Sequence, residues 1–352
     1  MSSQANGRIV FSKIFDDDFC RELESRKLFL ITTQKVSEIL DVKSMVDGKH
    51  LDYLIVEVPD GEEQKSISVY KGILDRLAEE KFPRDGVIIG IGGGATTDLA
   101  GFVAATWMRG IDWIAIPTTL AAMVDAAIGG KTGINLDSGK NLVGSFHLPT
   151  MTVIDHRLLS TLDDRDLSAG MAEVIKCGMI DDPQILELAE RTSIDALARG
   201  EDQETLDLLI QKSVAVKDRI VSRDLRENGD RAFLNYGHTL GHAIEVAKDF
   251  QLRHGEAVSM GMIYAASLSG RFLGLADEVI QRQRDLLLRY RLPVTLHELN
   301  FEALLSIMQR DKKVKSGKMR FVLLKDVGHP ILVDSLEHDL LASVFNELSQ
   351  SA

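Results

Sequence analysis

Cysteine is scarce in this chain: Cys20 and Cys177 are the only two among 352 residues. Two cysteines are too few for a disulfide framework or for a thiolate zinc site. The first seven residues are polar and lack the basic and apolar regions of a signal peptide. We therefore expect a protein of the reducing cytoplasm.

Long apolar runs are also missing. The stretch 111–130 comes closest to the roughly 20 residues that a membrane helix needs, but Asp112, Pro117 and Asp125 interrupt it. Positive charge is in deficit as well, because 41 lysines and arginines face 53 acids and give a net charge of −12. We expect no membrane and no nucleic acid as partners, although a local basic pocket can still bind a small anion.

The first part of the chain alternates short β-branched runs with helical patterns, which predicts a Rossmann-like, mostly parallel sheet. The expected strands are 27–32, 53–58, 86–91, 113–116 and 151–155, and the expected helices are 66–80 and 97–106. Helical patterns then dominate at 184–198, 204–222 and 278–290, with short strands at 319–324 and 330–333. We expect an α/β domain over 1–158 and a mainly α-helical domain over 159–352.

A glycine-rich turn follows the third of these strands. Gly90, Gly92 and Ala95 satisfy the G-x-G-x-x-A pattern, and a helix comes directly after it. Such glycines let backbone N–H groups approach a pyrophosphate at a helix N-terminus, but they also serve simply to pack a helix on a sheet. The strand–turn–helix context favours a dinucleotide site.

A second glycine-rich stretch, 129–141, carries Lys131 and Lys140 and ends at Asn141. The Walker spacing is absent, so this is not a P-loop. Lysine on a flexible loop supplies charge to a phosphate and asparagine adds a directional donor. The alternative is a solvated surface loop; the position between two strongly patterned segments favours a functional loop.

Glu173 and Lys176 stand three residues apart in an otherwise apolar helical run. An ordinary helical salt bridge explains the pair. Unpaired charge in such a run is costly, however, so we expect further partners such as a metal and an anionic substrate.

Three of the nine histidines fall within seventeen residues: His238, His242 and His254. His238 and His242 lie on the same face of a predicted helix, a spacing that is typical of metal ligands. The alternative is a pair of polar residues on a helix that packs closely through Gly237 and Gly241. The spacing alone leaves both interpretations open.

Taken together, these motifs resemble the 3-dehydroquinate synthases, a family of sugar phosphate cyclases related to polyol dehydrogenases. The resemblance runs from about residue 60 to 324. The segments that carry it are 92–94, 98–101, 108–110, 117–120, 124–125, 129–133, 139–141, 172–176, 234–238, 254–258 and 311–313.

The resemblance implies one divalent metal ion, Zn²⁺ or Co²⁺, bound by Glu173, His238 and His254. His242, which helical spacing would pair with His238, faces the substrate in the family pattern. The resemblance also implies NAD as a cofactor. Its implied contacts are Glu62, Lys65, Gly93, Gly94, Asp98, Thr118, Thr119, Lys140, Thr161 and Leu162. Family members often carry an acid or asparagine after the first strand to touch the adenosine ribose; 32–35 has neither.

The implied substrate is 3-deoxy-D-arabino-heptulosonate 7-phosphate, a phosphorylated sugar acid. Its carboxylate would meet Lys217 and Arg231, and its hydroxyls Asp125 and Lys176. The residues implied around its phosphate and reacting carbons are Lys131, Asn141, Asn235, His242 and one of Lys312 or Lys313. Arg109 would reach a phosphate across the interface of a homodimer.

The activity so implied is a phosphate-eliminating lyase reaction of the shikimate pathway of aromatic amino acid biosynthesis. Transient oxidation, β-elimination, reduction and an intramolecular aldol would give 3-dehydroquinate. One alternative is another sugar phosphate cyclase, a 2-epi-5-epi-valiolone or 2-deoxy-scyllo-inosose synthase, whose substrate lacks a carboxylate. The others are a metal-dependent polyol dehydrogenase, which would accumulate NADH, and a non-catalytic binding protein. The cationic pair Lys217 and Arg231 favours the first activity.

Overall fold

The computed structural model describes residues 7–227, 229–315, 319–334 and 336–350, without the side chains of residues 311–315. The chain divides into two compact units, an N-terminal unit (Met1–Leu162) and a C-terminal unit (Asp163–Ala352). Residue 158, where the sequence suggests a boundary, lies in a 3-10 turn (His156–Thr161), and the first helix of the C-terminal unit begins at Asp164.

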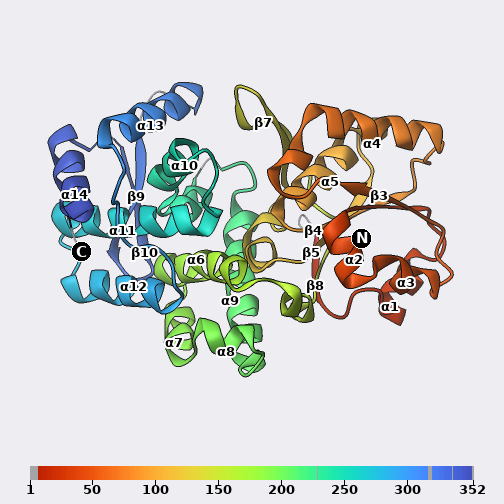
Figure 1. Cartoon of the computed structure of the whole chain (residues 1–352), viewed down its shortest axis with the longest axis horizontal. Coiled ribbons are helices and arrows are strands. Elements are labelled where there is room, and N and C mark those ends of the chain that lie inside the picture. Colours follow the sequence, from red (N-terminus) through yellow and green to blue (C-terminus); the bar gives the residue numbers. More distant parts are fainter. Residues whose placement is uncertain (1–6, 228, 316–318, 335, 351–352) are drawn as a thin grey trace. The chain divides into compact units, whose positions relative to one another are not determined.

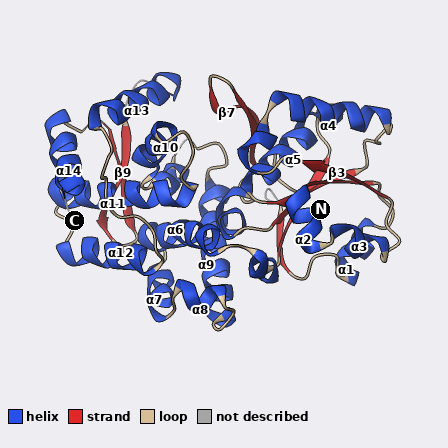
Figure 2. Cartoon of the chain, viewed as in Figure 1, coloured by secondary structure: helices blue, strands red, loops and turns tan. Residues whose placement is uncertain are grey.

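The N-terminal unit is built on a six-stranded parallel sheet (Figure 1, Figure 2). Its strands, in the order in which they pair, are β1 (Arg8–Phe11), β8 (Met151–Ile154), β5 (Asp112–Pro117), β4 (Val87–Gly92), β2 (Leu28–Thr33) and β3 (Tyr53–Val58). Every residue of β2, β4 and β8 is buried, which is why these strands read as continuous apolar runs. The predicted α/β class is confirmed, although β1 was not predicted.

The helices of this unit are α1 (Asp17–Leu23), α2 (Gln34–Leu40), α3 (Val42–Asp47), α4 (Ile67–Glu79) and α5 (Gly94–Thr106). One core cluster joins α4 and α5 to the sheet and includes Leu77, Leu99, Phe29 and Ile88. Because α5 follows directly on β4, its N-terminus lies at the carboxyl edge of the sheet, where ligands bind in such folds.

The glycine-rich stretch expected as a flexible loop is instead an antiparallel hairpin of β6 (Lys131–Leu136) and β7 (Gly139–Phe146). That prediction was wrong because glycine was read only as flexibility. A Cβ at Gly133 would lie 2.7 Å from the carbonyl oxygen of Val143, and one at Gly144 only 2.2 Å from that of Thr132. These glycines let two backbones approach closely.

The C-terminal unit is mainly helical, as predicted. Its elements are α6 (Asp164–Ile180), α7 (Pro183–Arg191), α8 (Ile194–Ala198), α9 (Gln203–Arg223), α10 (His238–Ala247), α11 (His254–Leu273), α12 (Asp277–Arg289), α13 (Phe301–Lys315), α14 (His338–Gln350) and the antiparallel pair β9 (Arg320–Asp326) and β10 (His329–Asp334). The single helix expected over 184–198 is two helices, because Ser193 takes an extended backbone conformation and caps α8 through the backbone N–H of Ala196.

Candidate functional site

Three helices of the C-terminal unit meet at a cluster of potential metal ligands. Glu173 lies in the middle of α6, while His238 and His254 are the first residues of α10 and α11. One ligand atom from each residue lies within 4.8 Å of the others. Glu173 and His238 are buried, and His254 is partly exposed. The structure thus brings together the three residues that the family resemblance names.

Glycine allows these helices to approach one another. A Cβ at Gly255 would lie 1.9 Å from the carbonyl oxygen of Ala169 on α6, and one at Gly261 would lie 1.9 Å from the carbonyl oxygen of Gly237. Gly237 itself has a φ of +80°, which only glycine adopts readily, and it is the N-cap of α10. The starts of α10 and α11 are therefore fixed by close backbone contacts (Figure 1).

The Glu173 carboxylate is almost fully buried and surrounded by nitrogen atoms. Lys176 forms an ion pair with Oε2, and the Nε2 atoms of His254 and His238 lie 3.3 Å and 3.6 Å from Oε1. Burial would raise the pKa of Glu173, but the Lys176 ammonium and the His254 ring outweigh it and hold the pKa well below its usual range. The group is thus anionic. Oε2 is held by the Lys176 ammonium, whereas Oε1 faces the two imidazoles and makes no hydrogen bond of good geometry, so Oε1 is suited to a metal cation.

The two histidines differ in their surroundings. Burial first, and then the Lys176 charge, hold the pKa of His238 well below its usual value, so its ring is neutral. The Nδ1 atom of His238 lies 3.1 Å from the carbonyl oxygen of Tyr236, which directs Nε2 toward Glu173. Burial would lower the pKa of His254, but hydrogen bonds to Glu173 and Glu245 raise it to about 10. The same carboxylates that attract a proton to this site attract a metal cation.

Two imidazoles and one carboxylate form a ligand set typical of catalytic zinc, with positions left for water or substrate. The residues present therefore fit one divalent ion. A second group of potential ligands, His242, Glu245 and His254, meets the same 4.8 Å limit and shares His254. His242 is exposed, and its ring centroid lies 5.2 Å from that of His238. Helical spacing alone therefore does not decide between the two sets.

Other predicted residues of this unit surround the α9–α10 connection. Lys217 and Arg231 are both buried, with 5% and 2% of their surface exposed. Arg231 donates through Nη1 to the carbonyl oxygen of Leu225 at 2.5 Å, and Asn235 donates through Nδ2 to Glu227 Oε1 at 2.5 Å. Lys312 and Lys313 belong to α13, and their side chains are among those that the structure does not describe.

In the N-terminal unit, the glycine-rich turn opens α5 as predicted. Gly93 is the N-cap and makes no side-chain capping hydrogen bond. A Cβ at Gly92 would lie 2.4 Å from Oγ1 of Thr96, so glycine is required there for the helix to pack against β4. The N-cap residue thus leaves the first backbone N–H groups of the helix without a capping side chain of its own, which suits a pyrophosphate.

Asp98 lies on α5 and forms an ion pair with Lys65. It accepts a hydrogen bond from the buried Lys65 ammonium at 2.6 Å, and Lys65 also donates to Asn141 Oδ1. Burial raises the pKa of Asp98, against the opposing effect of Lys65. Lys65, an expected NAD contact, and Asn141, an expected substrate contact, thus form one hydrogen-bonded group with Asp98.

A second polar group lies beside it. Asn135 on β6 donates through Nδ2 to Glu62 Oε2 at 2.9 Å, and its own Oδ1 accepts the backbone N–H of Asn141 at 2.9 Å. The Nζ atom of Lys140 lies 3.5 Å from Oε1 of Glu62. The remaining predicted residues of this unit are Thr118, which is buried, Thr119, Asp125 and Leu162, which are partly exposed, and Arg109, Lys131 and Thr161, which are exposed.

Sequence reasoning did not identify Glu245, Tyr236 or Asn135. Glu245 follows His242 by three positions on the same helix, a spacing that would have suggested it as a neighbour of the histidines. The Tyr236 contact is made by a backbone carbonyl and leaves no side-chain signal. Asn135 lies in the stretch that was expected to be a loop.

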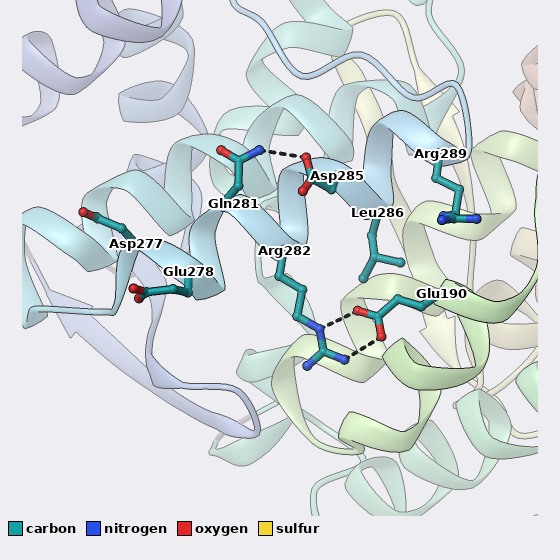
Figure 3. A pocket seen from close by; sticks show the side chains of 8 residues that line it. All are labelled: Glu190, Asp277, Glu278, Gln281, Arg282, Asp285, Leu286 and Arg289. Atoms are coloured by element: carbon teal, nitrogen blue, oxygen red, sulfur yellow. Dashed lines mark hydrogen bonds and ion pairs between the residues drawn. The ribbon is translucent and has the colours of Figure 1, made fainter.

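An open hollow of about 670 Å³ elsewhere in the C-terminal unit contains none of the predicted site residues. Figure 3 shows it between α7 and α12. Arg282 donates two hydrogen bonds to Glu190, from Nε to Oε1 at 2.6 Å and from Nη2 to Oε2 at 3.1 Å. The carboxylates of Asp277, Glu278 and Asp285 also line it. They would repel a phosphate or a substrate carboxylate, so this hollow is not the active site.

Comparison with known proteins identifies the family of this chain. A family model described as 3-dehydroquinate synthase N-terminal matches residues 55–169, and one described as 3-dehydroquinate synthase C-terminal matches residues 170–314. The 3-dehydroquinate synthase of Pseudarthrobacter chlorophenolicus is 47% identical over 308 residues, which cover 88% of this chain and 84% of that protein.

Solved structures share the fold. A 2-epi-5-epi-valiolone synthase from Streptomyces hygroscopicus with NAD⁺ and Zn²⁺ bound has a TM-score of 0.92 at 24% identity, over 99% of this chain and 98% of that chain. A 2-deoxy-scyllo-inosose synthase complexed with carbaglucose-6-phosphate, NAD⁺ and Co²⁺ has a TM-score of 0.84 at 28% identity, over 96% of each chain. Among the described residues, no helix is long and apolar enough to cross a membrane.

Proposed function

This chain belongs to the 3-dehydroquinate synthase family, and we propose that it uses a divalent metal held by its C-terminal unit and NAD held by its N-terminal unit. It is a phosphate-eliminating lyase of the shikimate pathway, which converts 3-deoxy-D-arabino-heptulosonate 7-phosphate to 3-dehydroquinate and phosphate. The reaction begins and ends at the same oxidation level, because one alcohol is oxidised and later reduced again.

The proposed metal ligands are the Glu173 carboxylate and one ring nitrogen each of His238 and His254. The observation that carries this proposal is the convergence of the three ligand atoms within 4.8 Å around a buried anionic carboxylate. A synthase that is 28% identical to this chain was solved with Co²⁺ and NAD⁺ bound, which supports a divalent ion and NAD as the cofactors. When bound, the metal supplies a Lewis acid for an alcohol oxygen, and NAD supplies a hydride acceptor that each turnover restores.

NAD is proposed to bind over the N-terminus of α5, where backbone N–H groups of Gly93 and Gly94 meet the pyrophosphate. The remaining proposed contacts are Glu62, Lys65, Asp98, Thr118, Thr119, Lys140, Thr161 and Leu162. Lys65 holds the Asp98 carboxylate at 2.6 Å, so this acid is fixed before the cofactor arrives.

The protein side chains do the positioning. Buried Lys217 and Arg231 provide charge and a planar donor fork that suit the substrate carboxylate. Lys176, fixed by its ion pair with Glu173, and Asp125 hold substrate hydroxyls. The groups proposed for the phosphate end and the reacting carbons are Arg109, Lys131, Asn141, Asn235, His242 and Lys312 or Lys313. Such preorganisation is the main contribution of the protein to the rate.

The assembly is proposed to be a homodimer, in which Arg109 of one copy reaches the phosphate held by the other. Its side chain is exposed, as a residue that contacts a second copy requires. Both cysteines are free and buried, which fits a reducing cytoplasm.

Another cyclase activity remains the second candidate, because two synthases of that kind share the fold. A direct test compares phosphate release from the heptulosonate phosphate, from sedoheptulose 7-phosphate and from glucose 6-phosphate, after removal of metal and reloading with Zn²⁺ or Co²⁺. We expect release from the heptulosonate phosphate only, and only after reloading. Preference for either sugar phosphate without a carboxylate would transfer the chain to another branch of the cyclases.

A further inference from the structure

Glu245 is a carboxylate beside the proposed metal ligands, and the proposed ligand set does not include it. It lies on α10, two turns after His238, and its Oε2 is 3.4 Å from Nδ1 of His254 at the start of α11. Only 12% of its side chain is exposed. A buried carboxylate placed between two helices is costly unless it has a definite partner.

The two nitrogens of His254 face different carboxylates. Nε2 lies 3.3 Å from Glu173 Oε1, and Nδ1 faces Glu245. His238 repeats this arrangement, with Nε2 toward Glu173 and Nδ1 3.1 Å from the Tyr236 carbonyl oxygen. In both rings, one nitrogen is held by an acceptor and the other is directed at the proposed metal position. The acceptor is a neutral carbonyl for one histidine and a carboxylate for the other.

We propose that Glu245 is a positioning residue of the metal site: it accepts the Nδ1–H of His254 and so leaves the Nε2 lone pair for the metal. The proposal rests on the proposed metal ligands. An acceptor on one nitrogen fixes the tautomer and the ring orientation, and a charged acceptor makes the other nitrogen a stronger donor. Loss of such a partner typically weakens metal binding by roughly 10–100-fold.

Glu245 is also a member of the alternative ligand set with His242 and His254. That set would need Nδ1 of His254 for the metal, and its His242 is exposed, whereas Glu173 and His238 are buried. Glu173 is moreover paired with a lysine through Oε2, and its other oxygen, Oε1, faces the Nε2 atoms of both His238 and His254. These observations favour Glu245 as the partner of a ligand rather than as a ligand.

The test measures Co²⁺ affinity by competition with a chelator, together with the visible absorption of bound Co²⁺. Glu245→Ala should weaken affinity about 10–100-fold and leave one ion bound per chain, with its spectrum still that of the parent ligand set. Glu245→Gln keeps an acceptor oxygen but loses the charge, so it should lie between Glu245→Ala and the parent. The matched control is Glu347→Gln, because Glu347 pairs with Arg271 of α11 at 2.6 Å, remote from the histidines.

Any of the following results would overturn the positioning role. One is parental affinity in Glu245→Ala, provided that its circular dichroism and NAD binding are also parental. Another is a loss as large in Glu347→Gln, which would indicate a general charge or stability effect. The last is loss of Co²⁺ in His242→Ala but not in His238→Ala, or two ions per parent chain, either of which would make Glu245 a ligand. Failure of the parent to bind Co²⁺ at all would instead contradict the proposed metal site itself.

Discussion

At the scale of single residues, the proposed metal site depends on a buried carboxylate that stays charged. Glu173 is 1% exposed, and its charge is stabilised by Lys176 and by two imidazoles. A buried charge without partners would cost several kcal/mol, so each group in this cluster depends on the others. A metal ion would complete it.

Removing one ligand tests this directly. His254→Ala should weaken metal binding by roughly 3 kcal/mol or more, one ligand's share of the ~10–16 kcal/mol typical of a complete zinc site. Metal content after dialysis against a chelator, measured by mass spectrometry, gives the answer. Parental occupancy in the variant would exclude His254 as a ligand. His297→Ala is a suitable control, since it removes an exposed histidine outside both ligand sets.

Arg231 carries the prediction on specificity. Arg231→Ala should lower kcat/KM for the heptulosonate phosphate. The lost transition-state stabilisation should be roughly 2–4 kcal/mol, because a buried charged contact loses one partner. The loss should be much smaller with sedoheptulose 7-phosphate, which has no carboxylate. Arg231→Lys keeps the charge but not the planar pair of donors, so its kcat/KM for the heptulosonate phosphate should lie between those of the parent and of Arg231→Ala.

The control for this pair of assays is Arg282→Ala, because Arg282 forms its ion pair with Glu190 in the hollow of Figure 3. Equal losses of Arg231→Ala on both substrates would show that Arg231 supports the fold rather than the substrate.

At the scale of elements, the ligands are brought together by glycines that let α10 and α11 begin beside their neighbours. Gly261→Ala would place a methyl group 1.9 Å from the Gly237 carbonyl oxygen. We expect it to destabilise the protein by about 1–3 kcal/mol, as overpacking does, and to weaken Co²⁺ binding at the same time. Gly72→Ala on α4 has nothing within 4 Å of the new Cβ and should be neutral or stabilising by up to about 1 kcal/mol. Urea unfolding measures the stability of both variants, and chelator competition measures their Co²⁺ affinity. Equal stability and equal affinity in Gly261→Ala and Gly72→Ala would contradict the packing argument.

The N-cap of α9, the helix that carries Lys217, gives a prediction with a pH dependence. Asp202 accepts the backbone N–H of Thr205. The side chain of Thr205 first, and then the Thr192 side chain and this backbone N–H, lower the pKa of Asp202 through hydrogen bonds. Because the folded pKa is depressed, the stabilisation is present above the unfolded pKa of about 3.9 and is lost as pH falls through the folded value. Asp202→Ala should therefore cost about 1 kcal/mol at pH 7, and less and less below pH ~4.

Urea unfolding over that pH range measures this difference. Asp75→Ala, which breaks an exposed i,i+4 pair with Lys71, should cost only a few tenths of a kcal/mol. A pH-independent loss in Asp202→Ala would argue against the capping role.

How far the sequence alone leads can also be seen in particular elements. β2 and β4 were predicted because strands buried on both faces are continuous apolar runs. The β6–β7 hairpin was missed because its glycines serve close backbone contact, which the residue type does not distinguish from flexibility. Glu173 and His254 are far apart in sequence and lie on different helices, so only the family motifs linked them. Helical spacing favoured His242 instead.

At the scale of the whole molecule, each unit supplies a different part of the chemistry. The N-terminal unit presents a helix N-terminus and the Lys65–Asp98 pair, which suit a dinucleotide. The C-terminal unit presents the ligand cluster and the buried cations Lys217 and Arg231. In the proposed reaction, the oxidation that is later reversed needs the dinucleotide, and the substrate carboxylate needs the cations. Neither unit alone accounts for the reaction.

The central claim is that this chain eliminates phosphate in a redox-neutral cycle. The most direct measurement follows phosphate release and the absorbance of NADH together, with metal-loaded protein, excess heptulosonate phosphate and NAD at a concentration near that of the enzyme. We expect many phosphates released per NAD, with NADH never exceeding the amount of enzyme. Conversion of all the NAD to NADH in about one turnover, after which substrate consumption stops without phosphate release, would contradict the claim and would make the chain a dehydrogenase.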